Sequence, residues 1–430
     1  MTPQTVLKDL IVERPVAGGR MLARHEGRVV FVSGAIPGER IHAVLERAAQ
    51  QVLWARAVDI IEPSGDRREP LGDPTCGGLT YAHIVYERQR QLKAAVLVDA
   101  FRRVGKITLD VVPPVLPSPE AGYRWRARLH VRDHRAGFFK EQTHRLCEPA
   151  PGGPVRAETL DAVSRMLRAS SAGASACEAL VVAENGPGLE RVVHLEPREG
   201  SRLDDAAWGE LPAGITGMTT TVRQRTVTLA GSPRVTDTAS QLWGAESSPL
   251  SQQTMWTRSA ASFFQGNRYL TGTLVRHVLL HASASHVADL YAGVGLFAVA
   301  LASNGTHVVA VENDPQSGTD LDLNAAPWAS YLETVHASVE EVLPELQPGL
   351  VGAVVMDPPR AGLSRRGLSS LMSLSVPRLI YVSCDPATLA RDAALLVAGG
   401  YGIRDVTAFD LFPTTAHVET VVIFERDSSN

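Results

Sequence analysis

The residues with the clearest potential for chemistry follow an apolar stretch near the C-terminus. Residues 379–383 have the composition of a buried strand, and Cys384, Asp385 and Pro386 come directly after them. Aspartate is a good helix N-cap, and proline fits the first helical position, where no amide donor is needed. A thiol just ahead of that helix would lie in the positive end of the helix dipole, which favours the thiolate, whereas the Asp385 carboxylate opposes it. A buried cysteine at a strand end is the alternative interpretation.

Glu419 supplies a second group, in His417-Val418-Glu419 just before the last apolar stretch. A lone glutamate at such a place is ordinarily a solvated surface group. Together with Cys384 it meets the needs of methylation at C5 of a pyrimidine. The C5 carbon of uracil becomes a nucleophile when a thiolate adds to C6. A general base must then remove the C5 proton so that the thiol can leave.

A glycine-containing turn indicates a nucleoside-cofactor site. Residues 287–291 are strand-like, Gly293 and Gly295 follow them, and Glu312 ends the next apolar stretch. Glycines let the backbone approach a ligand closely, and the acid can bind both ribose hydroxyls. This pattern alone leaves NAD and S-adenosylmethionine open.

Asp357-Pro358-Pro359-Arg360 follows another strand-like run. An acid at a strand tip followed by two prolines makes a rigid ledge at the carboxyl edge of the sheet, beside the cofactor crevice. A related ledge in amino-group methyltransferases ends in an aromatic that stacks on the target. Arg360 replaces that aromatic here, so an exocyclic amine is a less natural target. A strand-ending turn is the alternative interpretation.

The order of these patterns predicts three domains and an α/β fold class. Residues 1–62 show short strands separated by Gly/Pro turns, which is typical of a small β-barrel. Residues 63–255 predict a mixed α+β domain, with a helix over 86–104 and loops at 149–154, 170–175 and 185–188. Residues 256–430 alternate strands with helices and predict a doubly wound, Rossmann-like parallel sheet.

An arginine-rich strand in the central domain is a candidate RNA contact. Its alternation would place four arginines on one face, with Tyr123 and Trp125 on the other side: Arg124, Arg126, Arg128 and Arg132. Such a face can bind phosphates with aromatic support. A solvated edge face is the alternative.

Composition indicates a protein of the cytoplasm. The hydrophobic fraction is 44% and the charged fraction 20%, which are ordinary for a globular protein, and no apolar stretch is long enough for a membrane span. The start lacks the layout of a signal peptide. Four scattered cysteines suit a reducing compartment better than a disulfide framework. Residues 1–150 carry 23 basic against 17 acidic side chains, which suggests a polyanion-binding end.

The motifs together resemble the RNA 5-methyluridine methyltransferase family, the TrmA/RlmD-type enzymes that use S-adenosylmethionine. Five matching motifs occur in the family's order: 262–267 (SFFQGN), 289–295 (DLYAGVG), 357–360 (DPPR), 383–386 (SCDP) and 417–419 (HVE). Residues 18–19, 34–39 and 62–64 resemble a TRAM domain, an RNA-binding barrel attached to RNA-modifying enzymes.

The resemblance implies roles for individual residues. Cys384 corresponds to the nucleophile and Glu419 to the proton acceptor. Eight positions correspond to cofactor contacts or lie in the cofactor turn: Gln265, Tyr291, Gly293, Gly295, Leu296, Glu312, Ser338 and Asp357. We expect a monomer that flips a uridine of structured ribosomal or transfer RNA into its pocket.

Ribosomal members of the family often hold a [4Fe-4S] cluster with four cysteines, and the chain departs from that pattern. Cys76 and Cys147 match two of the ligands, whereas Pro70 and Leu79 occupy other ligand positions. We therefore expect no iron–sulfur cluster. Two other functions stay open at this point: methyl transfer to cytosine or a small molecule, and RNA binding or folding without chemistry.

Overall fold

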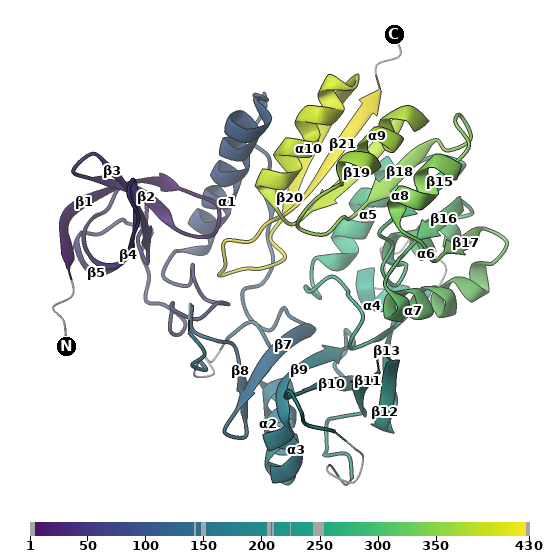
Figure 1. Cartoon of the computed structure of the whole chain (residues 1–430), viewed down its shortest axis with the longest axis horizontal. Coiled ribbons are helices and arrows are strands. Elements are labelled where there is room, and N and C mark those ends of the chain that lie inside the picture. The colour runs from purple at the N-terminus through teal and green to yellow at the C-terminus, as the bar shows by residue number, and fades with distance from the viewer. Residues whose placement is uncertain are drawn as a thin grey trace.

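The computed structural model describes residues 5–141, 143–147, 152–203, 208, 210–223, 225–243 and 253–426. Figure 1 shows an N-terminal barrel at one side of the molecule, a central sheet below and a large C-terminal sheet with helices on both faces. Helix α1 lies between the barrel and the C-terminal sheet. The α/β fold class is confirmed.

The barrel is built from five strands that close in the order β1-β2-β3-β5-β4. They are β1 (Val6–Pro15), β2 (Met21–His25), β3 (Arg28–Ser33), β4 (Arg40–Ala48) and β5 (Val52–Glu62). Alternate residues such as Val30 and Val32 point inward and are fully buried. The barrel expected from the short strands is therefore present.

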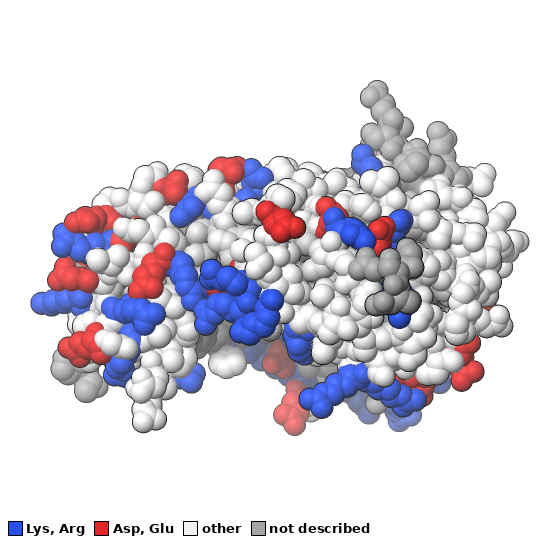
Figure 2. Space-filling view, turned by 90° about the horizontal axis from the view of Figure 1, so that it is seen from above, with Lys and Arg blue, Asp and Glu red and all other residues white. Residues whose placement is uncertain are grey.

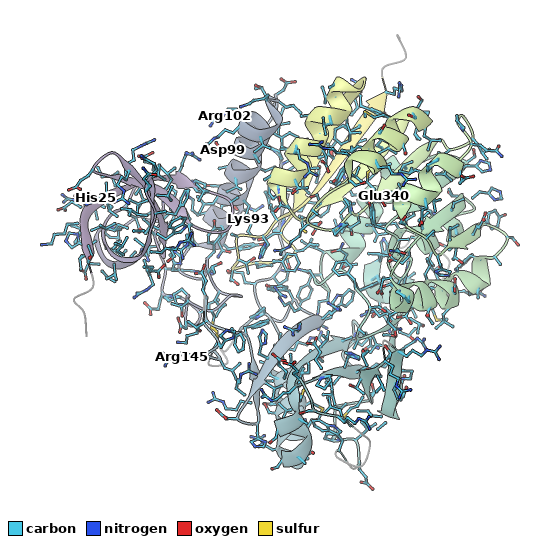
Figure 3. All side chains as sticks on the ribbon, in the orientation of Figure 1. His25, Lys93, Asp99, Arg102, Arg145 and Glu340 are labelled. Carbon is cyan, nitrogen blue, oxygen red and sulfur yellow. A yellow bond between two sulfur atoms is a disulfide. The ribbon has the colours of Figure 1, made fainter. Side chains whose placement is uncertain are left out.

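Helix α1 (Tyr86–Ala100) continues as a π-helical turn, η1 (Phe101–Gly105), in agreement with the helix predicted over 86–104. It touches both neighbours, because Leu92 belongs to the barrel core while Leu97 and Phe101 belong to the core of the C-terminal sheet. Lys93, labelled in Figure 3, forms a fully buried ion pair with Asp410. Both packing and charge therefore join α1 to the C-terminal domain.

The central region holds a six-stranded sheet in the order β12-β11-β10-β9-β7-β8. Its strands are β7 (Arg126–Arg132), β8 (Arg135–Gly137), β9 (Cys177–Glu184), β10 (Arg191–Pro197), β11 (Gly217–Val222) and β12 (Arg225–Gly231). Helix α2 (Ala157–Ala169) packs on its buried face. Helix α3 (Ser171–Ala176) corrects the loop expected at 170–175. The loop expected at 149–154 lies partly outside the described residues.

The C-terminal sheet has eight strands in the order β17-β16-β15-β18-β19-β21-β20-β6. Its strands are β6 (Val115–Leu116), β15 (His286–Leu290), β16 (His307–Val311), β17 (Leu332–Val335), β18 (Ala353–Met356), β19 (Arg378–Ser383), β20 (Tyr401–Phe409) and β21 (Glu419–Arg426). Strands β15 to β19 are parallel, and β21 is antiparallel to both of its neighbours. The sheet is thus mixed at this side, because a short connection returns the chain directly from β20 to β21.

Helices cover both faces of this sheet and bury two separate apolar cores. They are α5 (Thr271–His281), α6 (Leu296–Ser303), α7 (Pro315–Ala325), α8 (Val339–Val342), α9 (Arg365–Leu374) and α10 (Pro386–Ala398), with the short turns η3 (Ala326–Trp328) and η4 (Leu343–Glu345). A small ribbon, β13 (Arg234–Thr238) with β14 (Met255–Ser259), and helix α4 (Ala239–Trp243) precede them.

Strand β6 and helix α1 come from the expected central range, yet they pack with the C-terminal sheet. The division at 62/63 and 255/256 stays a prediction.

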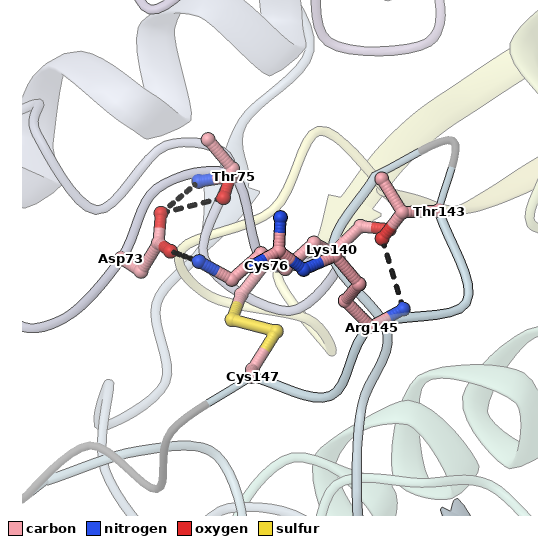
Figure 4. The surroundings of a disulfide bond; sticks show 7 residues. All are labelled: Asp73, Thr75, Cys76, Lys140, Thr143, Arg145 and Cys147. Atoms are coloured by element: carbon pink, nitrogen blue, oxygen red, sulfur yellow. Dashed lines mark hydrogen bonds and ion pairs between the residues drawn. A yellow bond between two sulfur atoms is a disulfide. The ribbon is translucent and has the colours of Figure 1, made fainter.

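A disulfide joins Cys76 to Cys147, with a Cα–Cα distance of 5.9 Å (Figure 4). It ties two segments that also exchange backbone hydrogen bonds, such as Glu141 N–H to the Thr75 carbonyl at 2.7 Å. Lys140 and Asp73 form an ion pair beside it. The bridge corrects the expectation, drawn from four scattered cysteines, that these two are reduced. The partners are 71 residues apart in sequence, and only the fold brings them together.

None of the helices in the described ranges combines the length and apolar character that a membrane span requires.

Candidate active site

The carboxyl ends of β15, β18 and β19 meet at one edge of the sheet. From β15 the chain runs outward through β16 and β17 and then returns to β18 on the other side of β15. Ligands bind at such a point of reversal in open α/β sheets. The motifs that follow these three strands, at Tyr291, Asp357 and Cys384, are thereby brought to one crevice.

The turn after β15 is bound by Glu312, the residue that directly follows β16. Glu312 accepts hydrogen bonds from Gly293 N–H at 2.8 Å and from Asp314 N–H at 2.7 Å. Gly293 and Gly295 both have positive φ, of 58° and 86°. A Cβ on Gly295 would lie 2.8 Å from the Leu321 side chain, so the close packing there requires glycine.

A cavity of about 290 Å³ opens beside this turn. Tyr291, Glu312 and Ser338 lie along its wall. The Ser338 hydroxyl also donates to Glu341 at 2.6 Å, at the start of α8. A smaller recess shares Tyr291 with this cavity and continues along the sheet edge to four further expected positions: Gln265, Gly293, Leu296 and Asp357. These expected cofactor positions therefore line two adjoining recesses that share Tyr291, which together are called the cofactor path.

Asp357 lies at the inner end of that path. Its carboxylate accepts a hydrogen bond from the Gln265 side-chain amide at 2.9 Å. Burial raises the pKa of Asp357 to about 7, and the Gln265 hydrogen bond only partly offsets this. Asp357 thus sits poised between its charged and neutral forms at neutral pH.

Strand pairing brings Cys384 and Glu419 together. Strands β19 and β21 are antiparallel, with Ser383 opposite Thr420. Cys384 directly follows β19 and Glu419 begins β21, so the two residues lie at the same end of this strand pair. After burial, the charge of Glu419 is the next cause that raises the pKa of Cys384, so the two groups lie within electrostatic reach of each other. The thiol and the carboxyl group are therefore neighbours at the same sheet edge as Asp357.

The helix start predicted after Cys384 is confirmed. Asp385 caps α10 by accepting hydrogen bonds from Ala387 N–H at 3.0 Å and Thr388 N–H at 2.9 Å, and Pro386 is the first helical residue. The cap fixes the backbone next to Cys384, whose side chain is half-buried. The residue next to the cap is therefore fixed in its backbone, and its side chain is not fully buried.

The environment of the site disfavours negative charge on both reactive groups. Burial raises the pKa of Cys384 to about 11, and the Glu419 carboxylate adds to this effect. Burial also raises the pKa of Glu419 well above its usual range, with a further contribution from Asp357. Glu419 is 3% exposed, and its Oε1 atom has no hydrogen-bond partner among the described residues.

Arg360 is a residue whose role the sequence did not assign. Its guanidinium lies against the thiol and lowers the pKa of Cys384, and it acts in the same direction on Glu419. The loop that carries it is clamped to α10, because Thr388 Oγ1 donates to the Arg360 carbonyl at 3.0 Å and Arg391 donates to the Ala361 carbonyl at 3.0 Å. The sequence signal for a role of this residue was that an arginine stands where amino-group methyltransferases have an aromatic side chain.

Asp289 is a second residue without an assigned role. It is 1% exposed, and its carboxyl group accepts a hydrogen bond from Ala298 N–H at 2.9 Å in the first turns of α6. Burial raises the pKa of this group well above its usual range. The sequence signal for a role of Asp289 was its position near the end of a strand, just before the glycine turn. Its hydrogen bond with Ala298 indicates that it fixes α6 against β15.

Three of the four arginines of the predicted strand lie on β7, whereas Arg124 precedes this strand and forms isolated bridges. Tyr123 and Trp125 are buried. Arg128 is bound to Glu196 through two of its nitrogens, with Nε–Oε1 at 2.9 Å and Nη2–Oε2 at 2.5 Å. Arg126 is half-buried and donates to a backbone carbonyl.

Arg124 is the member of this strip that lies next to the candidate active site. Its guanidinium carbon is 5.1 Å from the Phe412 ring centroid. The pKa of His417 is lowered to about 4, first by burial and then by the positive charges of Arg360 and Arg124.

Comparison with known proteins supplies the family. Residues 245–427 match the family model described as tRNA (Uracil-5-)-methyltransferase. The chain is 31% identical to the 23S rRNA (uracil(1939)-C(5))-methyltransferase RlmD of Pseudomonas entomophila, over 97% of this chain and 93% of that protein. The chain belongs to the RNA uracil-5-methyltransferase family.

Other relatives agree with this family assignment. An uncharacterized RNA methyltransferase of Streptomyces coelicolor is 33% identical, over 96% of this chain and 91% of that protein. The crystal structure of the Pyrococcus abyssi tRNA (uracil-54, C5)-methyltransferase, in complex with S-adenosyl-L-homocysteine, has the same fold. Its TM-score is 0.73 at 23% identity, with 96% of this chain and 99% of that chain covered.

The iron–sulfur cluster found in some members of this uracil-5-methyltransferase family does not fit the residues present here. Four cysteine thiolates hold such a cluster. In this chain Cys76 and Cys147 are bonded to each other, and Pro70 and Leu79 stand at other ligand positions. The absence of a cluster stays a prediction, which iron in anaerobically purified protein would contradict.

Proposed function

We propose that this protein transfers a methyl group from S-adenosylmethionine to C5 of a uridine in structured RNA. The observation that carries the proposal is the pairing of β19 with β21, which brings Cys384 and Glu419 to the same end of the sheet, where the charge of Glu419 acts on the Cys384 thiol. A thiol and a base are the two groups that C5 methylation needs. Membership of the family gives the proposal its acceptor, the C5 carbon of uracil in RNA.

The cofactor path offers groups for the nucleoside of S-adenosylmethionine. Glu312, in its wall, can bind the ribose hydroxyls, and the glycine turn lets the backbone approach the nucleoside. The remaining contacts come from Gln265, Tyr291, Leu296, Ser338 and Asp357. When bound, the cofactor supplies an electrophilic methyl group on a positively charged sulfur, and that charge favours the ionised form of nearby carboxyl groups.

Cys384 and Glu419 then act in sequence on the uracil ring. The Cys384 thiolate forms a bond to C6, which makes C5 a nucleophile that accepts the methyl group. Glu419 removes the C5 proton, and the electron pair of that C–H bond reforms the C5–C6 double bond as the C6–sulfur bond breaks. The thiolate is regenerated, and the proton remains on Glu419. Arg360 supports the first and last steps, because its charge favours the thiolate.

Burial of Glu419 suits it to its role as base. A carboxylate that is 3% exposed and has an unpartnered oxygen holds a proton more tightly than one in water. The same burial keeps bulk water from the adduct. The target base must therefore leave its stack to reach the thiol, and we propose that the enzyme flips it out.

The barrel and the β7 strip form the proposed RNA-binding part of the molecule, with Arg124, Arg126 and Arg128 as candidate contacts. Figure 2 shows basic and acidic side chains over the barrel end of one face, with a group of basic side chains beside it, while much of the opposite end is uncharged. Basic side chains outnumber acidic ones in residues 1–150. We propose that the protein acts as a monomer in the cytoplasm.

Labelled S-adenosylmethionine tests this function and identifies the RNA. The enzyme is incubated with separate pools of transfer and ribosomal RNA that lack 5-methyluridine, and the nucleosides are analysed. We expect label in 5-methyluridine from one pool, and none with Cys384→Ala. Label in 5-methylcytidine, or no label from protein shown to bind the cofactor, would contradict the proposal.

A further inference from the structure

Two histidines and an aspartate meet on the far side of helix α5 from the cofactor turn. His277 and His281 are four residues apart on α5, so their side chains lie on one face of the helix. Asp405 comes from β20, which passes this face. The candidate ligand atoms of the three residues all lie within 4.8 Å of one another.

One ring nitrogen is aimed at the carboxylate. His277 Nε2 is buried and makes no close hydrogen bond among the described residues, and it faces Asp405 Oδ2 at 3.4 Å in a loose ion pair. The His277 ring is held in place by an edge-on contact with Phe409, at 5.6 Å between centroids. A buried ring nitrogen without a partner costs free energy unless something binds it.

Asp405 is directed toward the histidines by the local backbone. The register of β20 with β21 shifts between Ile403 and Asp405, and such a bulge re-aims the side chain that follows it. Thr407 Oγ1 donates to Asp405 Oδ2 at 2.9 Å, which orients the carboxylate as an outer partner does in metal sites. The carboxylate is 37% exposed, so a water molecule can reach the same point.

We propose that His277, His281 and Asp405 bind a divalent transition-metal ion of the Zn²⁺ class and thereby fasten α5 to β20. Two imidazoles, a carboxylate and a water are a donor set that Zn²⁺ takes in four-coordinate sites. Metal–ligand bonds of roughly 2 Å are reached by small side-chain rotations from the present positions. Mg²⁺ prefers an all-oxygen shell and is not expected to bind here.

One cation beside α5 already has a counter-charge. Arg378 donates to the His281 carbonyl at 3.0 Å, and its charge is balanced by Glu425, with Nη2–Oε1 at 2.7 Å. The site is distinct from the thiol site, and the inference does not depend on the proposed function. Its expected role is to stabilise the packing of α5 against the sheet.

Calorimetric titration of chelator-treated full-length protein tests the site, with ZnCl₂ and MgCl₂ as probes. All samples carry Cys384→Ser, because an accessible thiol also binds Zn²⁺; Cys177 is buried and the other two cysteines are bonded to each other. We expect about one equivalent of bound Zn²⁺ and an unfolding midpoint that rises with Zn²⁺ but not with Mg²⁺.

Two variants locate the ion. His281→Ala removes a half-exposed side chain and should abolish both the binding and the rise in unfolding midpoint while leaving the metal-free midpoint nearly unchanged. His286→Ala, which removes a histidine stacked on His307 elsewhere, should bind Zn²⁺ as the parent does. Absence of Zn²⁺ binding to the parent, or unchanged binding by His281→Ala, would overturn the proposal.

Discussion

Burial raises the pKa of both Cys384 and Glu419 and so disfavours their charged forms. Single neighbouring residues determine the size of each shift. The pKa of Cys384 is raised to about 11 by burial and by Glu419, while Arg360 opposes the shift. The thiolate is therefore a minor form at neutral pH in the absence of ligands. Arg360 is the cation whose removal would make it scarcer still.

Replacement of Arg360 is predicted to move the pH dependence of methyl transfer. Without the guanidinium the pKa of Cys384 rises further, so a given thiolate fraction is reached only at higher pH, with about a tenfold loss of thiolate per pKa unit at neutral pH. Single-turnover methyl transfer by Arg360→Met, measured from neutral to alkaline pH, should show its ascending limb shifted to higher pH.

A matched variant separates charge from shape at this position. Arg360→Lys keeps a positive charge and should recover part of the shift, because the ammonium can also favour the thiolate. If the rate–pH curve of Arg360→Met rises over the same pH range as that of the parent and only its maximum rate is lower, Arg360 does not act through the pKa of Cys384.

At the scale of elements, α1 holds the barrel and the catalytic sheet together. Its side chains enter both cores. Lys93 on this helix is fully buried against Asp410, and its ammonium also donates to the Phe412 carbonyl at 3.0 Å. Asp410 directly follows β20, on the connection to Glu419, so the ion pair also fixes the segment that positions the base.

Lys93→Met is predicted to destabilise the protein by about 3–5 kcal/mol, because it leaves the Asp410 carboxylate buried without a partner. Urea unfolding followed by circular dichroism measures the loss. The double variant Lys93→Met/Asp410→Leu removes both charges and should recover much of the stability. Equal losses in the single and double variants would contradict this explanation.

Elements were predictable where local signals agreed with tertiary packing. Strands β15, β18 and β19 were found because each apolar run ends at a turn residue, and the α10 start because Asp385 and Pro386 mark it. Helix α3 was missed because Gly173 and two serines interrupt its alanines, and a glycine–serine cluster is typical of a loop. It forms where Ser170 caps Gly173 N–H at 3.0 Å and where Gly173 packs so closely on Trp208 that a Cβ would lie 2.6 Å away.

At the scale of the whole molecule, the proposed RNA-binding strip and the catalytic domain meet near Arg124. Arg124 is at the junction, since it contacts Phe412 and influences His417. Arg128, by contrast, already has a carboxylate partner in Glu196. The three candidate arginines are therefore not equivalent.

Arg124→Ala is predicted to weaken RNA binding and to reduce the slope of log affinity against log salt by about 1, as for the loss of a single phosphate contact. Arg225→Ala, an exposed arginine on the outer edge strand β12, is the matched control and should leave both quantities unchanged. Equal effects of the two substitutions would mean that Arg124 makes no specific contact.

The sequence predicted which residues belong to the candidate site, but it did not predict how they are arranged in space. Spacing and motif order indicated Cys384, Glu419, Asp357 and Glu312. Their convergence depends on strand order and on the antiparallel placement of β21, which a linear sequence does not display. The pairing of Cys76 with Cys147 and the union of α5 with β20 near Asp405 depend in the same way on distant segments.

The most direct test of the central claim is covalent trapping of RNA by Glu419→Gln. Addition of Cys384 to C6 and acceptance of the methyl group by C5 do not need the base, whereas release of the enzyme does. Denaturing electrophoresis with mass spectrometry should therefore show an RNA–protein adduct for Glu419→Gln in the presence of S-adenosylmethionine, and none for Glu419→Gln/Cys384→Ala. Normal turnover by Glu419→Gln, or an adduct that survives loss of Cys384, would contradict the roles given to these two residues.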